Sequence, residues 1–176
     1  DIKSTGVPLG LVLQNLQAES GLLELGFDFR FFENSYSGLY VNAGGFVTFT
    51  GGQSFNVNTT EIPSTDPPNN LIAGWWSILD PGADDGEIYY QTLGDPGERV
   101  FVIQYDNVNH LKINTGSVNF DKAAPVSFQI RLYEKTNKIE VHYKEALYNN
   151  STVGNIKFYH RTGIENGAGT IGEILP

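Results

Sequence analysis

The segment 126–144, VSFQIRLYEKTNKIEVHYK, contains the strongest indication of the fold. In its first half, apolar side chains occupy every second position from Val126 to Leu132, with polar side chains between them. The second half repeats this alternation from Ile139 to Tyr143. A period of two places the apolar side chains on one face of a strand. Because the polar residues 134–137 join the halves, the segment predicts an antiparallel β-hairpin with one buried face.

Runs of similar composition, rich in β-branched and aromatic residues, occur on both sides of this hairpin. The expected strands are residues 9–17, 22–32, 39–42, 46–50, 71–76, 87–92, 99–107 and 155–161. The first of these could also form a short helix. Gly and Pro are frequent between the runs, as expected for turns. The pattern predicts an all-β fold, a two-sheet antiparallel β-sandwich that is jelly-roll-like, as one domain over residues 1–176.

Composition narrows the classes of function. The chain has 176 residues, no Cys and no Met, and a net charge of −9. The lack of Cys excludes disulfides, thiolate metal sites and a cysteine nucleophile. The acidic charge disfavours nucleic acid and anionic membranes as partners, and no apolar run is long enough for membrane insertion. Acidic surfaces attract cations, of which calcium is abundant outside cells, although the excess acid could serve solubility alone. The missing Met indicates a module of a longer chain.

Four blocks of sequence resemble a known type of module. They are residues 25–49 (LGFDFRFFENSYSGLYVNAGGFVTF), 62–73 (IPSTDPPNNLIA), 75–90 (WWSILDPGADDGEIYY) and 162–167 (TGIENG). In this order they resemble a β-sandwich module of bacterial secreted and surface proteins. The resemblance covers roughly residues 22–172. The module is similar to nidogen-type extracellular domains and to the ligand-binding domains of large calcium-dependent RTX adhesins.

This resemblance implies an extracellular, cell-surface module for adhesion or ligand binding, without enzymatic activity. Some of the adhesin domains resemble peptide binders that hold a C-terminal carboxylate through calcium. Two departures from the pattern stand out. Ala43 and Gly44 replace the usual small polar residues, and residues 77–79 separate Trp76 from Asp80. The second departure weakens the transfer of a metal site from the family.

The segment 80–87, DPGADDGE, is the first candidate site. Its four carboxylates, predicted as Ca²⁺ ligands, are Asp80, Asp84, Asp85 and Glu87. Calcium takes about six to eight oxygen ligands, and the Gly and Pro residues could bend the backbone around an ion. The spacing does not fit an EF-hand. The alternative is a solvated acidic turn, in which Asp and Gly serve the backbone conformation.

A second loop, residues 64–70 (STDPPNN), is rich in oxygen acceptors and stiffened by two prolines. We predict that Asp66 joins the metal site if it approaches Asp80, and that Asn69 contacts the ligand. A stiff loop loses little entropy when it binds. The equally weighted alternative is a rigid turn, in which Asp66 and Asn69 cap their own backbone.

Aromatic pairs flank the acidic segment. Adjacent strand residues point to opposite faces, so one member of each pair can be exposed. Packing in the core is the default for these aromatics; if one of each pair is exposed beside the metal site, Trp76 and Tyr90 are the residues predicted to contact the ligand.

Together these features predict a calcium-dependent ligand-binding module of a bacterial adhesin, acting as a monomeric unit. Its expected partner is a peptide or protein terminus on another cell. No catalytic residue is predicted, because the sequence contains no nucleophile elbow, zincin motif or phosphate-binding glycine loop. The alternatives are a carbohydrate-binding module, a structural spacer that binds nothing, and a carbohydrase, which would need two facing carboxyl groups.

Overall fold

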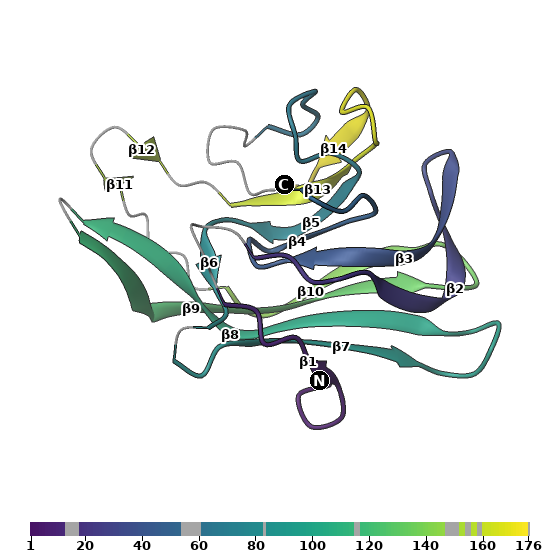
Figure 1. The fold of residues 1–176 in the computed structure, drawn as a ribbon, viewed down its shortest axis with the longest axis horizontal. Helices are drawn as coiled ribbons and strands as arrows, with labels where there is room; N and C mark the ends of the chain where they lie inside the picture. The colour runs from purple at the N-terminus through teal and green to yellow at the C-terminus, as the bar shows by residue number, and fades with distance from the viewer. Residues whose placement is uncertain are drawn as a thin grey trace.

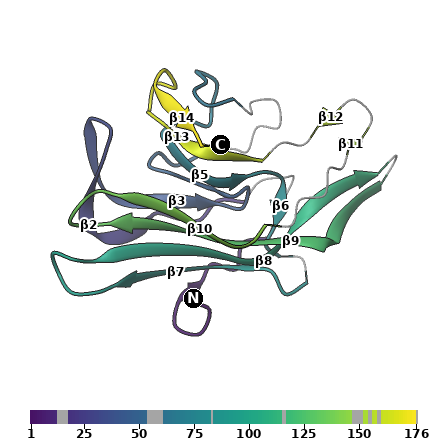
Figure 2. The ribbon, with the colours of Figure 1, turned by 180° about the vertical axis from the view of Figure 1, so that it is seen from behind.

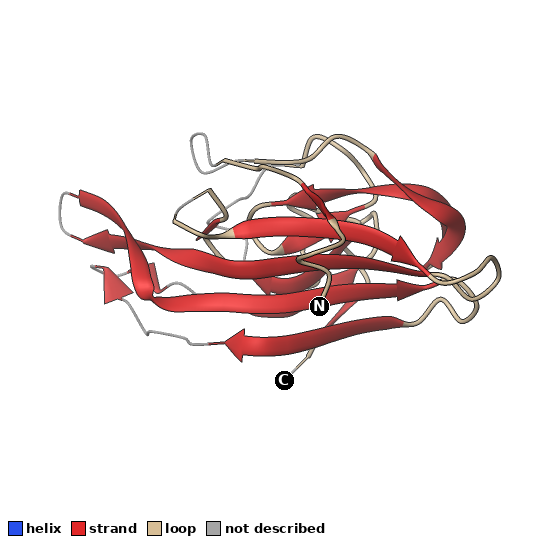
Figure 3. Ribbon diagram, turned by 90° about the horizontal axis from the view of Figure 1, so that it is seen from below, coloured by secondary structure: helices blue, strands red, loops and turns tan. Residues whose placement is uncertain are grey.

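Strands are the regular elements of this chain, with loops and turns between them (Figure 3). The computed structural model describes residues 1–12, 18–53, 61–82, 84–114, 117–146, 152–153, 156–157 and 160–175. Within these ranges there is no helix, and two antiparallel sheets pack together. The predicted all-β, two-sheet antiparallel sandwich is therefore confirmed.

The first sheet has the strand order β1-β7-β8-β9-β10, and β6 also pairs with β8. These strands are β1 (Val7–Pro8), β6 (Leu79–Asp80), β7 (Glu87–Leu93), β8 (Val100–Asn114), β9 (Ser117–Tyr133) and β10 (Ile139–Ala146). The pair β8 and β9 extends past the rest of the sheet as a long ribbon (Figures 1 and 2).

The second sheet has the order β14-β13-β5-β4-β3-β2. Its strands are β2 (Leu23–Phe31), β3 (Asn34–Asn42), β4 (Phe46–Thr48), β5 (Leu71–Trp76), β13 (Arg161–Glu165) and β14 (Gly172–Ile174). A separate short pair consists of β11 (Thr152–Val153) and β12 (Ile156–Lys157). The strand expected over residues 9–17 is not seen at 9–12, and its remainder lies outside the described residues.

The hairpin of β9 and β10 has the register that its alternation predicts. Leu132 pairs with Ile139 and Ile130 pairs with Val141. The apolar side chains of β9 from Val126 to Leu132 are buried at 0–2% exposure. They pack against the phenylalanines of β2, which alternate in the same way along the opposing sheet. The core therefore lies between the two sheets, as expected for a sandwich.

Tyr105 joins the two sheets inside this core. Its ring is fully buried and stacks on Phe128 with 4.4 Å between ring centroids. Its hydroxyl donates a hydrogen bond to the carbonyl oxygen of Asn42 at 2.6 Å, across the sandwich. Burial raises the pKa of Tyr105 well above its usual value, so the hydroxyl keeps its proton.

The turn between β3 and β4 depends on Gly45. Its φ of +83° is in the region that favours glycine. The carbonyl oxygen of Gly45 accepts hydrogen bonds from the backbone N–H groups of Gly74 and Trp75. A Cβ at this position would lie 2.0 Å from the carbonyl oxygen of Trp75. The turn is thus held against β5 at a distance that leaves no room for a side chain.

Glu134 ties together two turns at one end of the first sheet. Its carboxylate accepts hydrogen bonds from the Arg99 guanidinium at 2.6 and 2.9 Å and from the backbone N–H groups of Gly97 and Arg99. Arg99, and to a smaller extent these N–H groups, lower the pKa of Glu134 to about 2.

A carboxyl group whose pKa is lowered by folding stabilises the fold above its unfolded pKa, and this contribution is lost as pH falls toward the folded value. We expect Glu134→Gln to lose less stability than the parent chain as pH falls from 4.5 to about 2, because the variant lacks the carboxylate that is protonated in this range. Urea denaturation at pH 7 and pH 3 measures the difference. Glu98→Gln, at an exposed ion pair with Lys135, is the control and should keep the parental pH dependence. An unchanged pH dependence in Glu134→Gln would contradict the assignment.

Candidate functional site

The acidic segment 80–87 connects β6 to β7, and both of these strands pair with β8. Asp80 lies opposite Asn109 and Glu87 lies opposite Asp106. These partners are three residues apart, which separates the two acidic backbones by roughly 10 Å. The two ends of the segment thus lie along the same edge of β8, at positions three residues apart.

The carboxylates of this segment have local partners. Asp80 is 7% exposed, and its Oδ1 accepts a hydrogen bond from Gly82 N at 2.9 Å. Asp84 is exposed, and its Oδ2 accepts from Asn109 Nδ2 at 3.3 Å. Glu87 Oε1 accepts from Gly10 N and Ile88 N, and Asp85 is exposed. These contacts are more typical of an acidic turn, the alternative interpretation, than of carboxylates arranged around a metal ion.

Asp66 lies at the other end of β5 from Asp80. Residues 64–70 precede β5, whereas Asp80 follows it, and the strand from Leu71 to Trp76 spans roughly 17 Å. The shared calcium site of Asp66 and Asp80 is therefore not formed. The Asp66 side chain is exposed, and its backbone N–H donates to Ser64 Oγ at 3.2 Å. Within the described ranges, no three His, Asp or Glu side chains are grouped so that they could hold a metal.

The two predicted aromatic contacts both pack against other apolar side chains. Trp76 is 4% exposed and packs with Phe46, Ile62 and Leu71 in a small second core. Tyr90 is partly buried against the main core, with its ring 6.0 Å from that of Phe101. Trp76 therefore packs against apolar side chains, as the default interpretation has it, on the face of β5 opposite to Trp75, which belongs to the main core.

Asn69 has a different environment, because its side chain lies beneath its own loop next to Glu165. Glu165 ends β13 and is 1% exposed. Its Oε2 accepts a hydrogen bond from Ser64 N at 2.6 Å. Burial raises the pKa of Glu165 to about 7, against the lowering effect of that hydrogen bond. Glu165 is a residue that the loop sequence could not reveal, since about a hundred positions separate the two.

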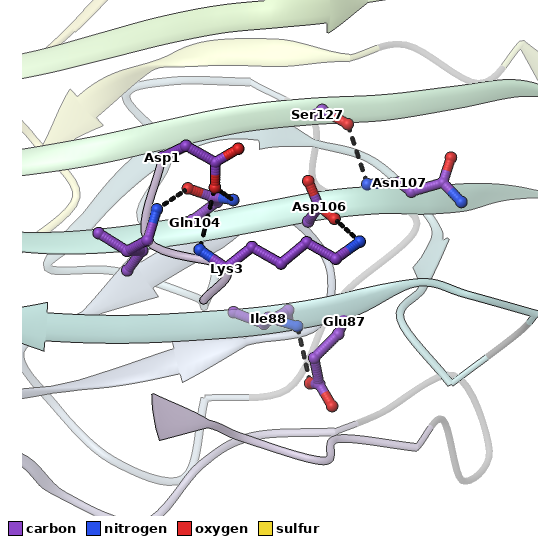
Figure 4. A network of polar contacts seen from close by, with 9 residues as sticks. Asp1, Lys3, Glu87, Ile88, Gln104, Asp106, Asn107 and Ser127 are labelled. Carbon is purple, nitrogen blue, oxygen red and sulfur yellow. Dashed lines mark hydrogen bonds and ion pairs between the residues drawn. The ribbon is translucent and has the colours of Figure 1, made fainter. Parts of the chain in front are cut away.

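A groove of about 200 Å³ lies on the outer face of the first sheet. We call it the outer-face groove; the polar side chains that line it are Asp1, Gln104, Asp106, Ser127, Gln129, Arg131, His142 and Lys144. The N-terminal segment crosses this face of the sheet (Figure 4). Ile2 is 3% exposed there, and its N–H donates to Gln104 Oε1 at 2.9 Å.

A row of hydrogen bonds runs across the floor of this groove. Arg131 donates from Nε and Nη2 to Gln129 Oε1 at 2.8 and 2.6 Å. Gln129 Nε2 donates to Gln104 Oε1 at 2.6 Å, and Gln104 Nε2 donates to Asp1 Oδ1 at 2.9 Å. Both glutamines are less than 10% exposed, so the row is fixed in the sheet. The guanidinium of Arg131 is thereby held in one orientation.

Comparison with known protein families identifies the family to which the chain belongs. Residues 7–174 match a family model described as NIDO related, which is nearly the whole chain. The chain belongs to the NIDO-related family. This confirms the nidogen-type part of the resemblance, while the similarity to RTX adhesins stays a prediction. No curated protein and no solved structure was found to match the chain. In this NIDO-related chain, no helix among the described residues has the length and apolarity to cross a membrane.

Proposed function

We propose that this NIDO-related chain is a non-enzymatic binding module of a secreted or cell-surface protein. In this proposal, the outer-face groove recognises a peptide or protein through a carboxylate of the ligand. The observation that carries the proposal is the fixed guanidinium of Arg131 at the groove, which His142 and Lys144 also line.

Charge supports a carboxylate as the recognised group. The chain has a net charge of −9, yet Arg131, His142 and Lys144 all line the groove, together with the acids Asp1 and Asp106. A guanidinium fixed by Gln129 loses little side-chain entropy on binding, and arginine matches the geometry of a carboxylate. The groove acid Asp106 is already paired with Lys3 at 2.7 Å, which reduces its repulsion of an anion (Figure 4).

The same contacts argue against glycoside hydrolysis. That reaction needs two carboxyl groups that face each other across the substrate, one of them free to act as an acid. Asp106 has an ammonium partner in Lys3, and Asp1 Oδ1 accepts hydrogen bonds from Gln104 and from Lys3 N. Binding without chemistry is therefore the function that the groove supports best. Adhesion to another cell and dependence on calcium remain parts of the proposal for experiment to decide.

The experiment is a binding screen with the whole chain immobilised. Peptides with a free C-terminal carboxylate are compared with the same peptides as C-terminal amides, and a glycan array is run in parallel. We expect binding to the free acids but not to the amides. Arg131→Gln should weaken that binding roughly 10- to 30-fold, the value of one lost charge-assisted pair.

The matched control is Arg30→Gln, which removes the same charge from β2 in the other sheet. It should bind as the parent chain does, and melting curves should show that both variants are folded. Two results would contradict the proposal: equal binding of acids and amides, or parental affinity in Arg131→Gln. Binding to glycans alone would favour the carbohydrate-binding alternative, and no binding at all would favour the spacer.

A further inference from the structure

The N-terminal hook, which we define as residues 1–6, lies on the outer face of the first sheet (Figure 4). It folds back from β1, the edge strand beside β7. The backbone N–H groups of Thr5 and Gly6 donate to the carbonyl oxygen of Ile2 at 3.2 and 2.7 Å, and these bonds close the turn. The hook then reaches β8, where Asp1 is one of the residues that line the outer-face groove.

The contacts of the hook are those of a bound peptide. The backbone N–H of Ile2 donates to Gln104 Oε1 at 2.9 Å, and the Ile2 side chain is 3% exposed. Lys3 Nζ donates to Asp106 Oδ2 at 2.7 Å. In peptide recognition, main-chain hydrogen bonds contribute affinity, and the places taken by side chains contribute specificity. We call Gln104 and Asp106 of β8, together with the space that Ile2 fills, the hook seat.

The hook seat is held in place by the sheet itself. Gln104 Oε1 also accepts a hydrogen bond from Gln129 Nε2 at 2.6 Å, and Gln129 Oε1 accepts from the guanidinium of Arg131. These bonds do not involve the hook, so they would keep Gln104 in position after the hook had left. A site that is already ordered loses little entropy when a peptide binds to it.

Asp106 determines which kind of residue the hook seat accepts. Its side chain is only 7% exposed, and Lys3 supplies a positive charge to it. A carboxylate that is mostly buried is unfavourable when its cationic partner is removed. A segment that replaces the hook must therefore bring a basic side chain to Asp106, next to an apolar side chain in the place of Ile2.

Few contacts hold the hook in place. Lys3, Ser4 and Thr5 are all exposed, and Ile2 is the one buried residue of the six. The strand that follows, β1, has only two residues. Segments with few buried apolar contacts have low local stability and open more readily than the fold as a whole. The hook can therefore leave its seat while the two sheets stay packed.

We propose that the hook is an internal ligand, and that a peptide with an apolar residue followed by a basic one competes with it for the hook seat. This inference rests on the proposed function, because Gln104 and Asp106 also line the outer-face groove. The partner peptide then combines this pair of residues with the carboxylate that Arg131 receives. Because the hook is tethered, it competes at an effective concentration on the order of millimolar and lowers the apparent affinity for the partner.

The test uses the whole chain and a synthetic probe peptide with the sequence of residues 1–6, DIKSTG, acetylated at its N-terminus and amidated at its C-terminus. The probe has no C-terminal carboxylate, so its binding does not require recognition of that group by Arg131. Amide chemical shifts of the isotope-labelled chain show where the probe binds. We expect the double variant Ile2→Ala/Lys3→Gln, whose hook is weakened, to bind the probe on β7 and β8 roughly tenfold more tightly than the parent chain does.

Two changes test the contacts of the basic residue. A probe with glutamine in place of lysine should bind the double variant roughly tenfold more weakly, and Asp106→Asn in the double variant should weaken binding of the original probe by a similar factor. Asp28→Asn, which removes an exposed carboxylate from β2, is the matched control for Asp106→Asn and should leave probe binding unchanged. Lys135→Gln in the parent chain removes a lysine far from the hook and should not increase probe binding.

The proposal would be overturned if the probe bound the double variant no better than the parent chain, or if it bound only to the second sheet. Binding that survived both Asp106→Asn and the loss of the lysine would also contradict it. Melting curves check that each variant is folded. Failure of the proposed function has a different signature, since free-acid and amidated peptides would then bind the parent chain equally while the double variant still bound the amidated probe more tightly.

Discussion

Gly45→Ala should lower the free energy of unfolding by about 3–5 kcal/mol, a large part of the stability of a typical domain. The new Cβ would lie 2.0 Å from the carbonyl oxygen of Trp75, and φ is +83°. The turn cannot move away without loss of the hydrogen bonds that Gly45 O accepts from Gly74 and Trp75. Urea denaturation at 25 °C measures the loss, and we expect Tm to fall by roughly 10 °C.

Gly97→Ala is the matched control. Its φ is +91°, but no atom lies within 4 Å of a Cβ at that position. This variant carries the backbone strain without the clash, and it should lose only about 1 kcal/mol. Equal decreases in the free energy of unfolding of the two variants would contradict this prediction, because they would show that the close approach of Gly45 to β5 does not affect stability.

Tyr105→Ala is expected to have an effect of similar size, about 3–5 kcal/mol, because it leaves a cavity between the sheets. The ring is fully buried and stacked on Phe128. Denaturation followed by tryptophan fluorescence would measure the loss.

Tyr105→Phe separates the hydroxyl from the ring. It keeps the stacking but removes the hydrogen bond to the carbonyl oxygen of Asn42, and it should lose about 1–2 kcal/mol. Parental stability in Tyr105→Phe would mean that the hydrogen bond between the sheets contributes nothing. A loss as large as in Tyr105→Ala would mean that the ring contributes little.

Much of the fold could be predicted from the sequence, because alternation is a local signal. The hairpin of β9 and β10 has the expected register, and the phenylalanines of β2 face the core. Strand β9 is longer than expected and includes Pro125, a residue that normally argues against an inner strand. It is tolerated where the pairing with β8 changes register, between Val108 and His110.

The candidate sites were harder to predict, since they depend on which distant segments meet. Asp80, Asp84, Asp85 and Glu87 are close in sequence, but strand pairing separates the first from the last. That Asn69 contacts a ligand stays a prediction; its neighbour Glu165 comes from β13, and no local pattern indicates this contact. For the outer-face groove, alternation indicates that Gln129 and Arg131 point outward, but it gives no sign that the N-terminal segment lies across the same face.

The order of strands in the second sheet affects how the chain folds as it leaves the ribosome. Trp76 of β5 pairs with Arg161 of β13, 85 residues later. At about 5–20 residues per second, roughly 4–17 s pass before that partner is synthesised. Throughout this interval, one edge of β5 has unpaired N–H and C=O groups that other chains can bind. This edge of the nascent module therefore stays open to pairing with other chains until β13 has been synthesised.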